Sequence, residues 1–133
     1  MKKEKIEKWI LKAENDLKIA KDEILTENPA TDAICFHAQQ CVEKYLKAYL
    51  SFIDKPFGKT HDIALLIELC IEDNKEFNSL YDMMANKLTR YAVEIRYPDD
   101  FYFPSLEEAK EAIEICEKVK QFVTNKFKEM GIS

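Results

Sequence analysis

The segment from Ala30 to Phe52 constrains the fold of this chain more than any other. It contains neither Gly nor Pro inside it, and its apolar residues recur every three or four positions. Such spacing places side chains on one side of an α-helix. The apolar side is one broad arc of Ile34, Ala38, Cys41, Val42, Tyr45, Ala48, Tyr49 and Phe52. The segment therefore predicts a long helix with one side in a protein core.

The other side of this expected helix carries a line of polar residues, namely His37, Gln40, Lys44 and Lys47. A core-facing helix does not require two lysines, an imidazole and an amide in one line. Lysine binds phosphate groups as a point charge, and the imidazole and the amide can hydrogen-bond a phosphate or a base edge. The line is therefore a candidate anion site, and the alternative interpretation is a solvated helix face.

The rest of the sequence predicts four further helices and no strand. Only two Gly and four Pro occur, which leaves little material for tight hairpins. The same periodicity predicts helices over about 3–25, 61–72, 75–93 and 105–128, with loops at 53–59 and 96–104. We expect one all-α domain over residues 1–133, folded as an up-and-down bundle of four or five helices.

Capping residues indicate where three of these helices should begin. Asn28 followed by Pro29 is typical of a helix start and is expected to begin the helix that continues to Phe52. Thr60 is expected to cap the next helix, over about 61–72. Ser105 and Glu108 have the spacing of a capping box, in which each side chain bonds the other residue's backbone N–H.

Composition excludes several classes of protein. The net charge of −5 and the pI near 5.2 argue against nonspecific coating of nucleic acid, because such binding depends on neutralising phosphates. No run of 18 apolar residues predicts a transmembrane helix. The basic N-terminal stretch lacks the continuous apolar region of a signal peptide, so we expect a cytoplasmic protein.

The cysteines and the missing motifs exclude several chemistries. None of Cys35, Cys41, Cys70 and Cys116 forms a CxxC pair, and each lies in an apolar periodic segment, so we expect four reduced core thiols rather than a zinc site. Phosphate-binding glycine motifs, the HExxH zinc motif and the Glu-x-x-His pairs of di-iron bundles are also missing. The sequence therefore predicts neither a cofactor nor a metal.

Two further segments carry side chains suited to an anion. Lys59 and His61 flank Thr60 at an expected helix start, where free N–H groups attract anions; the alternative is an ordinary cap with an exposed histidine. Arg96 precedes Tyr97-Pro98 and should lie near a helix end, where it could bind a phosphate or pair with a nearby carboxylate.

Three consecutive aromatic residues, Phe101, Tyr102 and Phe103, follow in the same loop. Three neighbours cannot all face one core, so at least one should be exposed or covered by a partner. A homodimer contact is the preferred explanation, and base stacking is the alternative.

Together these segments resemble the HEPN domain family, a group of small all-helical prokaryotic proteins with relatives in higher eukaryotes. The resemblance rests on HAQQCVEKYLKA at 37–48, KTHD at 59–62 and RYPD at 96–99, in that order across nearly the full chain. It implies an up-and-down helical bundle that usually dimerises. It also implies a frequent pairing with a minimal nucleotidyltransferase, including toxin–antitoxin systems.

Many other members of this family are metal-independent endoribonucleases that carry an Arg followed four to six residues later by a His. This chain departs from that pattern, because the corresponding residues after Arg96 are Asp100, Phe101 and Tyr102, and those after Arg90 also include no His. Carboxylates and tyrosines shuttle protons less well than imidazole near neutral pH. The usual ribonuclease pair is therefore missing.

Three functions remain open at this point. The preferred one is a non-catalytic module that binds a nucleotide or similar phosphate ligand, or a short RNA, as a dimer and with a nucleotidyltransferase partner. Its candidate ligand-binding residues are His37, Gln40, Lys44, Lys47, Lys59, His61 and Arg96, with no catalytic residue. The alternatives are a ribonuclease toxin of the same fold that uses Arg96 with His37 or His61, and a purely protein-binding helical scaffold.

Overall fold

The computed structural model describes residues 2–93 and 103–131, and every regular element among them is a helix. The α-helices are α1 (Lys2–Glu23), α2 (Thr31–Phe52), α3 (Ile63–Asp73), α4 (Ser79–Asp82), α5 (Thr89–Val93) and α6 (Leu106–Glu129). Two short 3-10 helices, Lys75–Asn78 and Ala85–Leu88, lie between them. The predicted all-α class and the bundle architecture are confirmed.

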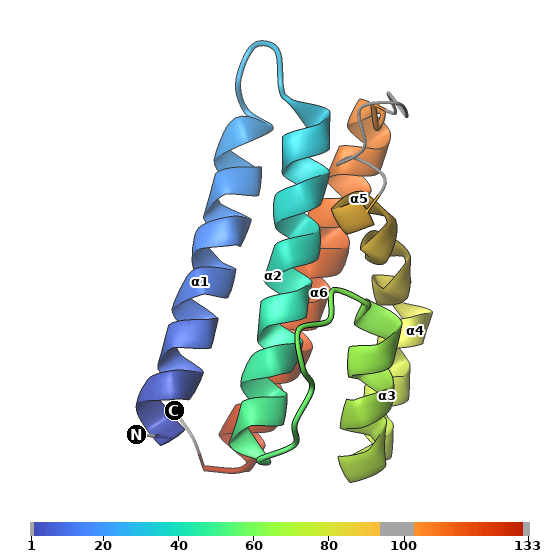
Figure 1. Ribbon diagram of the computed structural model, residues 1–133. Helices are drawn as coiled ribbons and strands as arrows, with labels where there is room; N and C mark the ends of the chain where they lie inside the picture. The colour runs from blue at the N-terminus through green and yellow to red at the C-terminus, as the bar shows by residue number, and fades with distance from the viewer. Residues whose placement is uncertain (1, 94–102, 132–133) are drawn as a thin grey trace.

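Three long helices, α1, α2 and α6, form the frame of the bundle (Figure 1). α1 and α2 are an antiparallel pair, and α6 lies beside α2 and runs in the same direction. The shorter helices α3, α4 and α5 pack along one side of this frame, and the start of α1 and the end of α6 lie at the same end of the bundle. α2 is the central helix, because it packs against α1, α3, α5 and α6.

The apolar stripes of the long helices form the core. All the residues of the predicted apolar arc of α2 are buried except Phe52, which is partly exposed and packs against the core. On α6 the expected inner residues Ala109, Ala112, Cys116, Val119, Val123 and Phe127 are buried, and Ile113 is half-buried. α1 and α6 are also joined at their edges by ion pairs from Lys21 to Glu117 (3.0 Å) and from Lys120 to Glu14 (2.8 Å).

The predicted capping box is confirmed, whereas two other predicted caps are wrong. Ser105 Oγ accepts from Glu108 N at 3.1 Å at the start of α6. α2 starts one residue after Ala30, without a side-chain cap, so Asn28 does not cap it. Asp62, not Thr60, caps α3, because its Oδ1 accepts from the backbone N–H of Ala64 at 3.0 Å. His61 therefore lies in the loop before α3.

The predicted single helix over 75–93 is instead a broken segment. Asn74 caps the first 3-10 turn by accepting from Glu76 N at 2.9 Å. Met84 then adopts a left-handed conformation, with φ of 65° and ψ of 24°, which stops the right-handed helical path. The segment therefore turns at Met84 and buries Phe77, Leu80 and Leu88 in separate short helices.

The four cysteines are free thiols buried in the core, as predicted. Burial disfavours the thiolate and raises the pKa of Cys35 to about 12 and that of Cys70 further. The described helices include none that is long and apolar enough to cross a membrane.

Candidate functional site

The polar side of α2 is covered by protein and does not form a solvated helix face. α1 lies against one edge of it, and the loop 53–62 crosses in front of it on the way to α3 (Figure 1). The side chain of Lys47 is only 8% exposed and that of Lys44 only 20%. Since a buried ammonium group is costly unless it is paired, the structure must supply carboxylates to both.

Asp16 of α1 supplies the first carboxylate, although it lies within the buried side of its own helix. Its Oδ1 accepts from His37 Nδ1 at 2.8 Å, and its Oδ2 accepts from Lys44 Nζ at 2.6 Å. His37 and Lys44 are two turns apart on α2, so one carboxylate joins both to α1. We call Asp16, His37 and Lys44 the Asp16 cluster.

Glu43 of α2 supplies the second carboxylate, and its side chain is almost fully buried. Its Oε1 accepts from His61 Nδ1 at 2.9 Å, and its Oε2 accepts from Lys47 Nζ at 3.0 Å. His61 reaches this position because it lies in the loop, outside α3. We call Glu43, Lys47 and His61 the Glu43 cluster; it ties the loop to the central helix.

Two glutamines of α2 extend the Glu43 cluster. Gln39, which is fully buried, donates from Nε2 to Glu43 Oε1 at 3.0 Å and to the backbone carbonyl of His61 at 3.4 Å. Gln40 in turn donates to Gln39 Oε1 at 2.7 Å. Gln40 belongs to the same polar line as His37 and Lys44, so the two clusters lie on neighbouring turns of one helix.

Aromatic rings close the deep end of the Glu43 cluster. The Lys47 ammonium lies 5.7 Å from the centre of the Trp9 ring on α1 and 5.6 Å from that of Phe57 in the loop. The two rings contact each other edge to face, with centres 6.1 Å apart. The ammonium is therefore held by a carboxylate and two ring faces, an arrangement that stabilises a desolvated cation.

The geometry fixes how each imidazole is presented. A carboxylate can only accept, so Nδ1 of His37 and of His61 donates to its carboxylate. No residue in 2–93 or 103–131 hydrogen-bonds the Nε2 atom of either ring. The side chains of His37 and His61 remain 26% and 47% exposed. Each imidazole is thus oriented through one nitrogen and available to a ligand through the other.

Two candidate residues remain, Lys59 and Arg96. Lys59 is exposed, two residues before His61, and forms no ion pair within the described residues. Arg96 falls in the stretch 94–102, outside the described residues, so its predicted role stays a prediction; the same holds for Phe101 and Tyr102. Phe103, the last residue of the aromatic run, is 67% exposed, as expected for at least one of the three.

Sequence reasoning missed the two carboxylates and the buried glutamine. The signal for Glu43 was available, because Gln39, Glu43 and Lys47 follow one another at i, i+4 spacing, where side chains meet on a helix. Asp16 interrupts the apolar stripe of α1, next to Leu17, and an acidic residue there suggests a buried partner. Neither pattern indicates which residue of another helix or loop pairs with the carboxylate.

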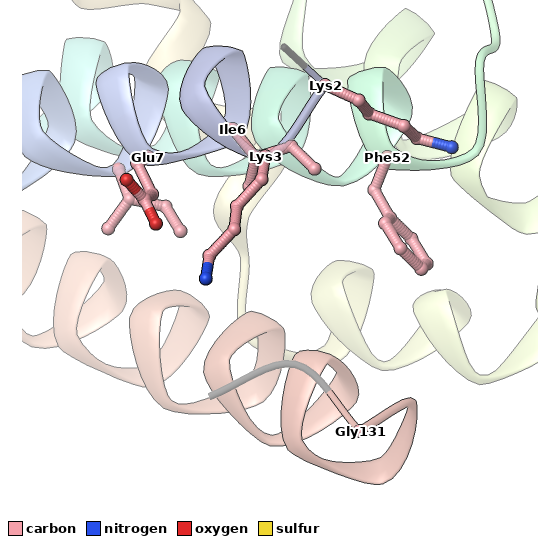
Figure 2. Close-up of a pocket in the computed structure, with 7 residues that line it drawn as sticks. Lys2, Lys3, Ile6, Glu7, Phe52 and Gly131 are labelled. Atoms are coloured by element: carbon pink, nitrogen blue, oxygen red, sulfur yellow. The ribbon is translucent and has the colours of Figure 1, made fainter.

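A separate cavity lies at the end of the bundle where α1 begins and α6 ends. Its volume is about 430 Å³, and its walls include Ile6, Ile10 and Phe52. Figure 2 shows the side chains of Lys3 and Phe52 directed toward the space between α1 and the end of α6. No candidate ligand-binding residue lines this mainly apolar cavity. In the described part of the chain, no group of three His, Cys, Asp or Glu side chains could hold a metal ion.

Comparisons with known proteins agree with the helical architecture. The family model of the HEPN domain matches residues 6–127. The chain is 29% identical over 137 aligned residues to the protein named "Putative toxin MJ1304" of Methanocaldococcus jannaschii, covering 90% of this chain and 88% of that protein. The crystal structure of ST0689, an archaeal HEPN homologue, matches with a TM-score of 0.68 at 24% identity, over 91% of this chain and 96% of that one. The chain therefore belongs to the HEPN domain family.

Proposed function

We propose that this HEPN domain is a non-catalytic module that binds the phosphate group of a nucleotide at the two histidine clusters of α2. The observation that carries the proposal is the paired presentation of His37 and His61. Each ring is fixed by a buried carboxylate through Nδ1, and each keeps Nε2 for an external group. Side chains that are already held in place bind a ligand at low entropic cost.

The candidate residues have different tasks in this proposal. His37, Gln40, His61 and the exposed Lys59 contact the ligand. Lys44 and Lys47 do not contact the ligand, because each is already paired with a carboxylate. Their role is to neutralise that carboxylate, which would otherwise be left buried and unpaired. Arg96, outside the described residues, stays a predicted further ligand residue.

We also propose that the protein acts as a homodimer and with a minimal nucleotidyltransferase, in a toxin–antitoxin type of pair. The name of the M. jannaschii relative supports a toxin–antitoxin setting. The exposed apolar side chains of Phe103 and Leu106 offer a contact for a second copy. Light scattering of the purified chain, with Phe103→Ser as the variant, tests the dimer.

Calorimetric titration with AMP, ATP, GTP and inorganic phosphate tests the ligand. We expect binding by at least one of them, and a loss of about tenfold or more in affinity for His37→Gln with His61→Gln. Lys110→Gln is the matched control, because Lys110 is an exposed residue of α6 that forms no ion pair with any residue of 2–93 or 103–131. No binding by folded protein would contradict the proposal and favour a protein-binding scaffold.

A second function, a metal-independent endoribonuclease toxin, is favoured by one observation. A carboxylate that accepts from Nδ1 of a histidine is the arrangement that orients imidazole general bases in enzymes, and this chain has two such pairs. Incubation with a structured RNA in EDTA tests it. Cleavage that disappears in His37→Gln or His61→Gln, and persists in Lys110→Gln, would place the enzyme ahead of the binding module.

A further inference from the structure

The cavity between the start of α1 and the end of α6 has an apolar interior that the proposed function does not use. Its volume of about 430 Å³ is in the range of pockets that hold small organic ligands. The buried Ile6 and the half-buried Ile10 form its wall on α1. Phe52 forms the wall on α2, and its ring packs edge to face on Phe127 of α6, with ring centres 5.9 Å apart. The interior is therefore suited to a hydrocarbon chain.

Two lysines of the first turn of α1 also line this cavity, and both are exposed. Lys2 Nζ lies 5.1 Å from the centre of the Phe52 ring and 3.0 Å from Asp54 Oδ2. Because the side chains of Lys2 and Asp54 are 49% and 78% exposed, their ion pair contributes little free energy, and Lys2 can exchange Asp54 for the carboxylate of a ligand. Lys3 forms no ion pair within the described part of the chain, and Figure 2 shows its side chain directed toward the cavity.

One acidic side chain, that of Glu7, also lines the cavity. Glu7 lies about one helical turn after Lys3 on α1, on the side away from Lys2. It disfavours a second negative charge beside it, so an anionic head group is favoured at the end of the cavity that carries Lys2 and Lys3. The cavity thus combines an apolar interior with one cationic end.

From these features we propose that the cavity binds a free medium-chain alkyl carboxylate. The chain lies against Ile6, Ile10 and Phe52, and the carboxylate accepts hydrogen bonds from Nζ of Lys2 and of Lys3. Several buried methylenes together outweigh an exposed ion pair, so the chain supplies most of the affinity. A concave cavity encloses a free molecule better than it fits a flat bilayer surface. The site is separate from the histidine clusters, and the proposal does not depend on the proposed function.

Calorimetry with sodium hexanoate, octanoate and decanoate tests the chain. We expect saturable binding of one molecule per protein chain, with affinity rising by up to about fourfold per added methylene. In NMR spectra of isoleucine methyl groups, octanoate should shift the signals of Ile6 and Ile10. Ile34 is the internal control, because it lies in the first turn of α2, which is antiparallel to α1 and so begins at the other end of the bundle. No saturable binding, affinity independent of chain length, or shifts confined to other isoleucines would overturn the proposal.

Charge variants test the head group. Lys2→Gln with Lys3→Gln should lower the affinity for octanoate by about twofold to fivefold and leave the affinity for the uncharged 1-octanol unchanged. Glu7→Gln should raise the octanoate affinity, and Lys110→Gln, on α6, should change neither ligand. An unchanged octanoate affinity in the double lysine variant, or equal weakening of octanoate and 1-octanol, would overturn the proposal. Binding to phosphatidylglycerol vesicles without binding of free octanoate would also overturn it, in favour of a membrane-binding surface.

Discussion

The two sides of α2 are both buried, but by opposite means. One side carries Tyr45 and Tyr49 and is buried by apolar contacts with α1, α3 and α6. The other carries Glu43 and Lys47 and is buried by ion pairs and hydrogen bonds with α1 and the loop before α3. The apolar side gains free energy from removing surface from water. The polar side only recovers what desolvation costs, and so it specifies geometry more than it stabilises.

The two sides of α2 also differ in whether their side chains can reach a ligand. A side chain on the apolar side, such as Tyr45, has no atom left for a ligand, because burial and its hydrogen bond to Glu14 occupy it. On the polar side, each carboxylate accepts hydrogen bonds from a histidine Nδ1 and a lysine Nζ. The Nε2 atom of each imidazole then has no hydrogen-bond partner among the described residues. Four substitutions test this contrast between the apolar and the polar side.

The largest effect is expected for Tyr45→Ala on the apolar side. It should lower the free energy of unfolding by roughly 3–5 kcal/mol, because it leaves a ring-sized cavity in the core. Tyr45→Phe is the matched control, since it keeps the ring and loses only the hydroxyl bond, at about 1 kcal/mol. Urea denaturation measures both. A loss below about 1 kcal/mol for Tyr45→Ala would show that this side is not the tightly packed one.

Glu43→Ala should have the next largest effect, about 3 kcal/mol, because it leaves the buried Lys47 ammonium without its carboxylate. Glu43→Leu together with Lys47→Met removes both charges and should recover most of this loss. If the double variant is as unstable as the single one, the polar side contributes net stability, and the contrast between the two sides would fail.

Asp16→Ala should lower the free energy of unfolding by less, about 1–2 kcal/mol. Asp16, like Glu43, accepts hydrogen bonds from one histidine and one lysine. Lys44 keeps more contact with water than Lys47, so it can be resolvated when its carboxylate is removed. Thermal unfolding of the two alanine variants in parallel tests this order. Equal losses would indicate that the Asp16 cluster is as dry as the Glu43 cluster.

The smallest effect concerns Glu14, which lies at the boundary between α1 and α6. Burial alone would raise its pKa, but hydrogen bonds from Lys120 and Tyr45 outweigh burial and hold the pKa below the usual 4.5. The ionised form therefore stabilises the fold above that pH, and this contribution is lost as the pH falls through the lowered value. Glu14→Gln should flatten the acid side of the stability curve. An unchanged acid limb would contradict this assignment.

The long helices were predictable because a single helix carries its own periodic signal. α2 and α6 begin and end within a few residues of expectation, and the capping box of α6 is local chemistry between Ser105 and Glu108. The segment 75–93 was not predictable in this way. Its apolar residues fit a helical period, but the break depends on Met84, a residue type that gives no warning of a left-handed conformation.

The candidate site also has a part that helix periodicity predicts and a part that it does not. Sequence spacing placed His37, Gln40, Lys44 and Lys47 on one side of a helix, and that placement follows from helix geometry alone. It could not show that Asp16, distant in sequence, neutralises Lys44, or that His61 turns back from its loop to Glu43. Such contacts depend on which elements pack together, and periodicity within one element holds no information on its neighbours.

Local spacing and residue type alone thus specify the helical class, the central amphipathic helix and the HEPN resemblance. The packing of distant segments is what covers the polar side of that helix, pairs its two lysines with carboxylates and orients the two imidazoles. The physical reason is desolvation. A charge brought into a bundle must find its counter-charge there, and the partner is fixed by the packing of distant segments.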